Sequence, residues 1–432
     1  MTRTYAVIIA LLATPAFAQT TAIVGGTVAI GDGSQPIENG TVLFRGDRII
    51  AAGAGIAVPR DARVIDAHGK WVAAGIVAGF SNLGLLDVDS VSESNDSVAP
   101  KSPFGAAIDI SPAINTNSAV VGMERAGGVT RAIVAPAAAG SIFAGQGAVI
   151  DLGVDSSPVT RPRAFEYLEL GENGAQRAGG SRPAAYAALR DAFGQAQDYA
   201  RSPKDFGGRE GESLVKRPDA AALLRVLEGK MPLLVHVERS SDIASALALK
   251  SDYPHLNLVL VGAAEGWMRA PAIAAAHVPV IAAGLSDLPE AFERLAATES
   301  NVGLLDRAGV VVAISTINMT EPPQQRRLNQ QAGNLVGIAR LPGMTGLDWG
   351  RAFATITSRP AQSLGMDGQI GSLRPGRQAD IVIWDGDPLE LASAPIAVFI
   401  DGRPQPMASR QRELRDRYMN PERGALPKAY QR

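Results

Sequence analysis

The chain has 432 residues, no cysteine and nearly balanced charge, with 41 Lys and Arg against 43 Asp and Glu. The missing cysteine excludes disulfides, cysteine nucleophiles and thiolate metal sites. The balanced charge gives no overall field that would attract nucleic acid or an anionic membrane, so neither is expected as a partner. A chain of this length with 46% apolar residues is large enough for a barrel and a smaller domain.

The first residues have the pattern of a secretory signal peptide. Arg3 gives a positive start, residues 6–13 (AVIIALLA) are apolar, and residues 16–18 (AFA) place small side chains at the two positions that a signal peptidase reads. We predict cleavage after Ala18, a mature chain that begins at Gln19, and a periplasmic or secreted location. A buried first helix is the alternative. No later stretch reaches the roughly 18 apolar residues of a membrane span.

Both ends of the remaining chain read as short strands separated by tight turns. Residues 21–72 contain IVGGTVAI, GTVLFRGDRII and RVIDAHGKWV, which alternate apolar with polar positions, and residues 371–403 have the same character. Such strands bury one face and need a second sheet to cover it. We therefore predict a small composite β-sandwich formed by residues 19–72 and 367–410, followed by a polar tail over 411–432.

The middle of the chain, residues 73–366, alternates short apolar strands with alanine-rich helices. Strand–helix–strand units that repeat every 20 to 35 residues or so are typical of parallel α/β proteins, and this many units favour a TIM-like (β/α)8 barrel. A doubly wound sheet is the alternative, although no G-x-G-x-x-G leads from a strand into a helix. The strand candidates are residues 128–135, 232–237, 256–261, 278–283 and 309–315. The helix candidates include residues 219–227, 242–249 and 288–298.

Sequence motifs on both sides of this barrel resemble those of the metal-dependent amidohydrolases. IVGGTV, IENGTVLFRGDRIIAAG and VIDAHGKWVAAGIV are similar to the family's first sandwich strands and first barrel strand. TITSRPAQSLG at residues 355–365, followed by IGSLRPGRQADIVIWDGDP, resembles its last barrel helix and return to the sandwich. GGVTRAIVAPAAAGSIFAGQGAVIDLG is similar to the imidazolonepropionase-like and aryldialkylphosphatase-like subgroup. The resemblance implies hydrolysis of C–N bonds by a metal-activated water, with zinc in intact relatives.

The resemblance also implies a set of metal ligands, most of which this chain lacks. Relatives carry His-x-His on strand one, a carboxylated lysine on strand four, a histidine on each of strands five and six, and an aspartate on strand eight. No lysine occurs between Lys101 and Lys204, where strand four falls. The other matching positions are Phe80 and Asn82 on strand one, His236 on strand five, Val261 or Gly262 on strand six, and Ile317 on strand eight.

One inherited ligand, His236, therefore remains. Apolar Phe80 and Ile317 suit a site that has stopped holding a cation, because a dry pocket without its cation gains by filling with hydrocarbon. We expect no bound metal and no other cofactor.

The polar side chains that remain near the barrel mouth allow several interpretations. His236 and Glu238 lie two residues apart on a strand, so both point the same way and form a candidate acid/base pair. The alternative is a histidine of the barrel core that is hydrogen-bonded to a neighbour. The candidate ligand-binding side chains, for which mutual hydrogen bonding or surface exposure is the alternative, are Asn82, Arg182, Thr316 and Asn318.

Two functions are left open by these residues. The first is an exported amidohydrolase-like protein with a degenerate metal site and little or no hydrolysis of its own. Such a protein would bind a small-molecule ligand, or pair with an intact amidohydrolase-like relative or with itself. The second is an active hydrolase that uses His236 and Glu238 on the C–N bonds of amides, cyclic amides or peptide-like substrates.

Overall fold

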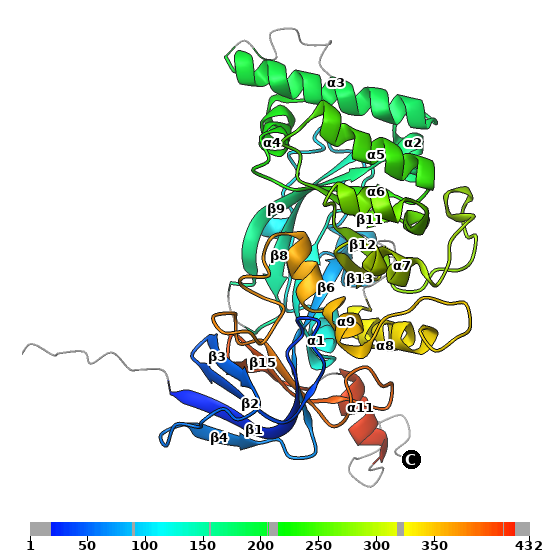
Figure 1. The fold of residues 1–432 in the computed structure, drawn as a ribbon. Coiled ribbons are helices and arrows are strands. Elements are labelled where there is room, and N and C mark those ends of the chain that lie inside the picture. The colour runs from blue at the N-terminus through cyan, green and yellow to red at the C-terminus, as the bar shows by residue number, and fades with distance from the viewer. Residues whose placement is uncertain are drawn as a thin grey trace, which may run out of the picture.

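The chain forms two eight-stranded sheets, one from its two ends and one from its middle (Figure 1). The computed structural model describes residues 19–88, 91–154, 157–204, 206, 215–317, 324–408 and 410–419. The predicted signal peptide, the candidate Asn318 and the end of the predicted polar tail lie outside these ranges. No helix within them is long and apolar enough to cross a membrane.

The sheet of the chain ends joins five N-terminal strands to three C-terminal ones. Its strands are β1 (Thr20–Ala29), β2 (Ile37–Arg45), β3 (Arg48–Gly53), β4 (Arg63–Asp66), β5 (Trp71–Ala74), β14 (Ile381–Trp384), β15 (Pro395–Ile400) and β16 (Arg403–Pro404). Their order is β16-β15-β14-β5-β1-β2-β3, and β4 pairs with β1. The two ends meet where β14 runs antiparallel to β5, with Ile381 opposite Ala74. The prediction that both chain ends build a second β domain is confirmed, and its strands belong to one hydrogen-bonded sheet, where the prediction was a sandwich.

The second sheet curls into a nearly closed barrel. Its strands are β6 (Ile76–Ser81), β7 (Val129–Val134), β8 (Phe143–Asp151), β9 (Val159–Glu169), β10 (Leu233–Val237), β11 (Leu258–Gly262), β12 (Val280–Ala283) and β13 (Val312–Ser315). They follow one another in chain order around the sheet. The first and last strands approach each other where the Ser315 hydroxyl donates to the Phe80 carbonyl at 2.7 Å and accepts from the Phe80 amide at 2.9 Å. The TIM-like barrel is therefore confirmed.

One strand departs from the expected parallel order. β8 runs antiparallel to both β7 and β9. The connections on its two sides, residues 135–142 and 152–158, are too short for the crossover of a dozen or more residues that parallel neighbours require. These strands form a meander inside an otherwise parallel barrel. The sequence-based prediction missed it because it assigned no strand between residues 135 and 232.

Helices cover the outside of the barrel. They are α1 (Ala119–Ala126), α2 (Glu172–Arg177), α3 (Arg182–Arg201), α4 (Arg217–Leu227), α5 (Ser240–Asp252), α6 (Ala270–Ala275), α7 (Asn301–Arg307), α8 (Leu328–Ile338), α9 (Trp349–Ala354) and α10 (Ser358–Ser363). A last helix, α11 (Arg410–Met419), follows the sheet of the chain ends. The helices expected at 219–227 and 242–249 are present as α4 and α5. The helix expected over 288–298 is wrong, because only a short 3-10 turn, Phe292–Arg294, forms there.

A buried arginine fastens the barrel to the sheet of the chain ends. Arg131 lies on β7, and its side chain is 2% exposed. Its guanidinium contacts Asp380 at 2.8 and 3.1 Å and Asp401 at 2.5 Å, both in the C-terminal part of the chain, and Asp151 of β8 at 3.8 Å. Burial by itself lowers the pKa of Arg131, but these carboxylates outweigh it and raise the pKa above its ordinary value. This contact between the barrel and the sheet of the chain ends is therefore a largely buried ion-pair network.

Replacing Arg131 with methionine should lower the free energy of unfolding by about 3–5 kcal/mol, because buried carboxylates would lose their cation. Urea denaturation measures this change. The matched control is Arg374→Met, which breaks an exposed contact with Asp32 at 2.7 Å and should cost no more than about 1 kcal/mol. Equal losses in the two variants would show that the Arg131 contacts do not hold the parts together.

Candidate functional site

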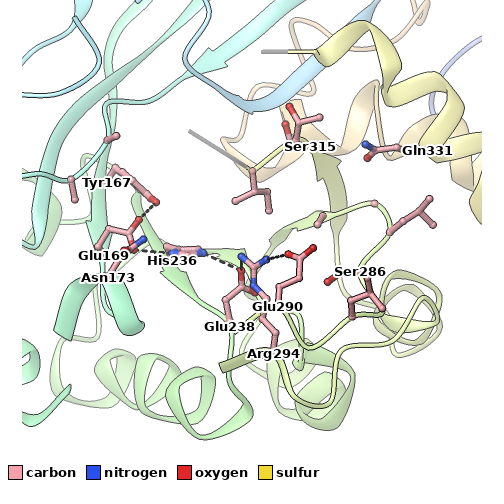
Figure 2. Close-up of a pocket in the computed structure, with 18 of the residues that line it drawn as sticks. Tyr167, Glu169, Asn173, His236, Glu238, Ser286, Glu290, Arg294, Ser315 and Gln331 are labelled. Carbon is pink, nitrogen blue, oxygen red and sulfur yellow. Dashed lines mark hydrogen bonds and ion pairs between the residues drawn. The ribbon is translucent and has the colours of Figure 1, made fainter. Parts of the chain in front are cut away.

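A cavity of about 700 Å³ opens at the carboxyl ends of the barrel strands (Figure 2). Its walls come from the ends of β7, β9, β10, β12 and β13 and from the segments that follow them. In barrels of this kind, ligand sites lie at this face. The cavity contains His236 and Glu238, so the structure places the two predicted acid/base residues at the barrel mouth.

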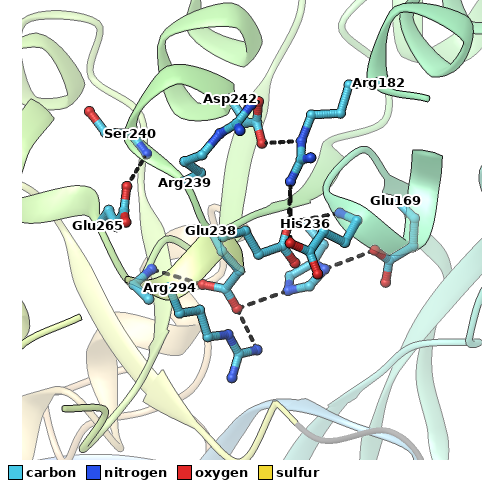
Figure 3. Close-up of polar contacts among 12 residues, drawn as sticks. Glu169, Arg182, His236, Glu238, Arg239, Ser240, Asp242, Glu265 and Arg294 are labelled. Atoms are coloured by element: carbon cyan, nitrogen blue, oxygen red, sulfur yellow. Dashed lines mark hydrogen bonds and ion pairs between the residues drawn. The ribbon is translucent and has the colours of Figure 1, made fainter. Parts of the chain in front are cut away.

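A continuous chain of polar contacts crosses the floor of this cavity. The Tyr167 hydroxyl donates to Glu169 at 2.6 Å, and the second oxygen of Glu169 lies 2.8 Å from Nδ1 of His236. Nε2 of His236 lies 3.1 Å from Oε1 of Glu238, which also accepts from Arg294 at 2.7 Å. Figure 3 shows His236 held between the two carboxylates. We call the residues Tyr167, Glu169, His236, Glu238 and Arg294 the charge chain.

Strand pairing explains why these side chains meet. β9 and β10 are parallel neighbours with Glu169 in register with His236. Side chains two residues apart on a strand point to the same face, so Tyr167 joins Glu169 inside the barrel, and Glu238 follows His236 at the end of β10. Arg294 lies in the segment after β12.

Two further carboxylates hold the segment that carries Arg294. Glu265 accepts from the backbone amides of Ser240 at 2.9 Å and Ala296 at 3.1 Å. Glu293 accepts from Arg182 at 3.0 Å, and Figure 3 shows Arg182 reaching Asp242 as well, at 2.7 Å. The segment is thereby fixed over Glu238, and the guanidinium of Arg182, a predicted ligand-binding group, is engaged by protein carboxylates.

The contacts of His236 define its protonation state. Both ring nitrogens face carboxylates, whereas a neutral imidazole donates from only one nitrogen. Burial by itself lowers the pKa of His236, but the charge and hydrogen bond of Glu169, together with those of Glu238, raise the pKa well above its ordinary value. Burial would raise the pKa values of the two carboxyls, yet His236 holds both below their usual range. The two carboxylates therefore favour the imidazolium form of His236.

The other predicted binding residues lie in different surroundings. Thr316 lines the cavity, and its hydroxyl accepts from the amide of Gln325, which also donates to the Phe80 carbonyl at 3.1 Å. Asn82 is buried with 1% exposure and is not part of the cavity wall. Thr316 is thus the one of these predicted binding residues that the described chain places in the cavity wall.

Comparisons with known proteins agree with this architecture. A sequence model described as "Amidohydrolase family" matches residues 313–404. The chain is 28% identical over 392 residues to the amidohydrolase tasK of Hapsidospora irregularis, covering 81% of this chain and 38% of that protein. It is 37% identical over 100 residues to the imidazolonepropionase of Maricaulis maris (strain MCS10), which is 23% of each chain. The chain is therefore similar to amidohydrolases in sequence over parts of its length and in fold.

Solved structures of amidohydrolases share the fold. An amidohydrolase from Thermotoga maritima MSB8 superposes with a TM-score of 0.76 at 23% identity, covering 89% of this chain and 99% of that one. Molinate hydrolase superposes with a TM-score of 0.54 at 18% identity, covering 90% and 95%. The chain spans well under half the length of the curated relatives it matches, 38% of one and 23% of the other.

The residues at the superfamily's metal positions do not fit a metal ion. Phe80 is fully buried, and its ring packs edge-on against Tyr167 with 5.0 Å between centroids. Gly262 has a positive φ of 86°, and a Cβ there would lie 2.7 Å from the Glu238 carboxyl carbon. Ile317 presents hydrocarbon to the cavity. In the part of the chain that the structure describes, no group of three or more His, Asp or Glu side chains is placed to hold a metal.

Sequence reasoning missed three members of the charge chain. Tyr167 and Glu169 lie on β9, which was not predicted, and Arg294 was assigned to a helix that does not form. A signal for the first two exists, because Tyr-x-Glu at 167–169 has the same spacing as His-x-Glu at 236–238. Nothing in the sequence points to Arg294, which reaches Glu238 through the folded loop.

We expect ¹⁵N NMR of histidine-labelled protein to show both ring nitrogens of His236 protonated at neutral pH. The stabilisation from this imidazolium is complete below the ordinary histidine pKa and is lost as pH rises through the raised pKa. Glu169→Gln should lower the pKa of His236, because the charged partner of Nδ1 is gone. His236→Gln identifies the signal. A neutral His236 ring at neutral pH would contradict this assignment.

Proposed function

We propose that this chain is a metal-independent, ligand-binding member of the superfamily with little or no hydrolysis of its own. The observation that carries the proposal is the engagement of both His236 ring nitrogens by Glu169 and Glu238. A histidine that binds a metal offers a deprotonated ring nitrogen. The one inherited ligand is therefore already used as a cation.

The surroundings of His236 support the same conclusion. A catalytic zinc site ordinarily has three protein ligands and an open water position. Here the imidazolium and the Arg294 guanidinium already neutralise Glu169 and Glu238, so an added metal cation would meet two positive charges at close range. His236 and Arg294 therefore supply the positive charge that a metal ion would otherwise supply to these carboxylates.

The cavity has the properties of a small-molecule site. Its volume of about 700 Å³ lies within the range of roughly 300–1,000 Å³ that is typical of ligand pockets. Neutral polar side chains line it beside the charge chain, among them Asn95, Asn173 and Ser286. Such groups fix the orientation of a ligand through hydrogen bonds. Binding therefore requires no metal in this cavity.

The rival function is hydrolysis of C–N bonds by His236 and Glu238, which requires one of these residues to act as a general base. A general base works best with a pKa near the operating pH. Glu238 accepts from His236, Arg294 and the Ala264 amide at 3.1, 2.7 and 2.8 Å, and these contacts hold its pKa below the ordinary value. Glu238 is a weak base in this arrangement, which favours binding over catalysis.

Purified protein should contain far less than one equivalent of zinc, manganese or iron by elemental analysis. Chelators should leave its melting temperature unchanged, because a metal bound only to the native state would add stability by mass action. His236→Gln should not change the metal content, and N-acyl amino acids, dipeptides and cyclic amides should remain intact. One tightly held metal per chain that is lost in His236→Gln, together with hydrolysis, would establish the rival function.

Export and a protein partner complete the proposal. We infer export from Arg3, the apolar residues 6–13 and the small residues of the AFA segment at 16–18. A partner, either an intact relative or a second copy, is supported by the relative tasK, in which the matched region is 38% of a longer chain. A barrel without metal chemistry would then act beside another polypeptide.

Protein purified from the native periplasm should begin at Gln19 and should carry a second amidohydrolase-like chain or a second copy. N-terminal sequencing and native mass spectrometry measure these two properties on one sample. A mature chain that starts at Met1 or Thr2 would refute export. Repeated recovery of a single chain at native expression levels would refute the partner and leave ligand binding alone.

A further inference from the structure

Two charged side chains in the cavity wall have no partner within the described chain. Arg177, the last residue of α2, and Asp287, in the segment after β12, make no hydrogen bond or ion pair with any described residue. The other charged groups of the wall pair with one another within the charge chain, and Glu290 joins Arg294 at 3.3 Å. The charges left for a ligand are therefore one cation and one anion.

These two side chains belong to opposite sides of the cavity. Arg177 follows β9, on the side of Glu169, whereas Asp287 follows β12, on the side of Arg294. Figure 2 shows their chain neighbours Asn173 and Ser286 on either side of His236 and Glu238. β9 and β12 are three strand positions apart in the barrel sheet, so a ligand that meets both side chains extends across the cavity.

The chemistry of the two ends selects a class of ligand. A guanidinium binds a carboxylate through two parallel hydrogen bonds, and an unpaired aspartate attracts an ammonium group. We propose that the ligand is a zwitterion of the amino-acid or dipeptide class, with its carboxylate on Arg177 and its ammonium group near Asp287. This inference rests on the proposed ligand-binding function.

Calorimetric titration with a panel of free amino acids and dipeptides tests it. The panel should yield binding at millimolar concentration or better. The C-terminal amide and the N-acetyl derivative of the best dipeptide should each bind about ten-fold more weakly or worse, because each loses one charged contact. Arg177→Gln should remove the preference for the acid over its amide, and Asp287→Asn should remove the preference for the free amine over its N-acetyl form.

Two surface variants serve as charge-matched controls. Arg190→Gln and Asp191→Asn change exposed residues of α3 that are not part of the cavity wall, and both preferences should persist in them. The inference is overturned if no free dipeptide or amino acid binds, or if Arg177→Gln weakens acid and amide equally. Neither result bears on the metal content, so the failure of this inference is distinguishable from the failure of metal-independent binding.

Discussion

The barrel mouth must neutralise two buried carboxylates, and the arrangement of the site follows from that requirement. Glu169 and Glu238 are 7% and 2% exposed. A carboxylate buried without a partner costs several kcal/mol or takes up a proton. Intact relatives bring a metal cation to this face, whereas here His236 and Arg294 supply positive charge from within the chain. Because His236 contacts both carboxylates, losing it would leave Glu169 without its cation and Glu238 with Arg294 alone, so the charge chain behaves as a unit.

The antiparallel strand β8 determines where Tyr167 and Glu169, two members of the charge chain on β9, are placed. The antiparallel β8 returns the chain so that β9 runs parallel to β10 and brings Glu169 into register with His236. Tyr167 then lies two residues back on the same face and donates to Glu169. The other part of the charge chain depends on loops, since Arg294 reaches Glu238 only while Glu265 and Glu293 hold its segment. His236 therefore lies between the paired strands β9 and β10 and the loop that carries Arg294.

The sequence predicted those parts of the fold that follow from a local periodicity of apolar residues. Alternation at the two chain ends and the parallel strand–helix repeats gave the composite sheet and the barrel. The β8–β9 hairpin was not predicted, because no helix separates its two long strands as in the strand–helix repeats. Its sequence was used only as evidence for the family resemblance. In the site, His236 was found through the family resemblance, and Glu238 through its spacing of two residues from His236 on one strand. Their partners Glu169 and Arg294 are 67 and 56 residues away from the group that each contacts, a relation that no local pattern contains.

Two positions that the family resemblance matches to metal ligands, Phe80 and Gly262, are part of the packing that supports the charge chain. Phe80 packs against Tyr167, whose hydroxyl donates to Glu169, so a histidine at position 80 would replace the phenyl ring in this contact with a smaller, polar ring. Gly262 leaves the space that Glu238 fills, and any larger side chain there would displace this carboxylate from His236 and Arg294. Restoring one ligand at a time would therefore weaken the charge chain before a metal site existed. The two arrangements compete for the same space, and a single substitution cannot convert one into the other.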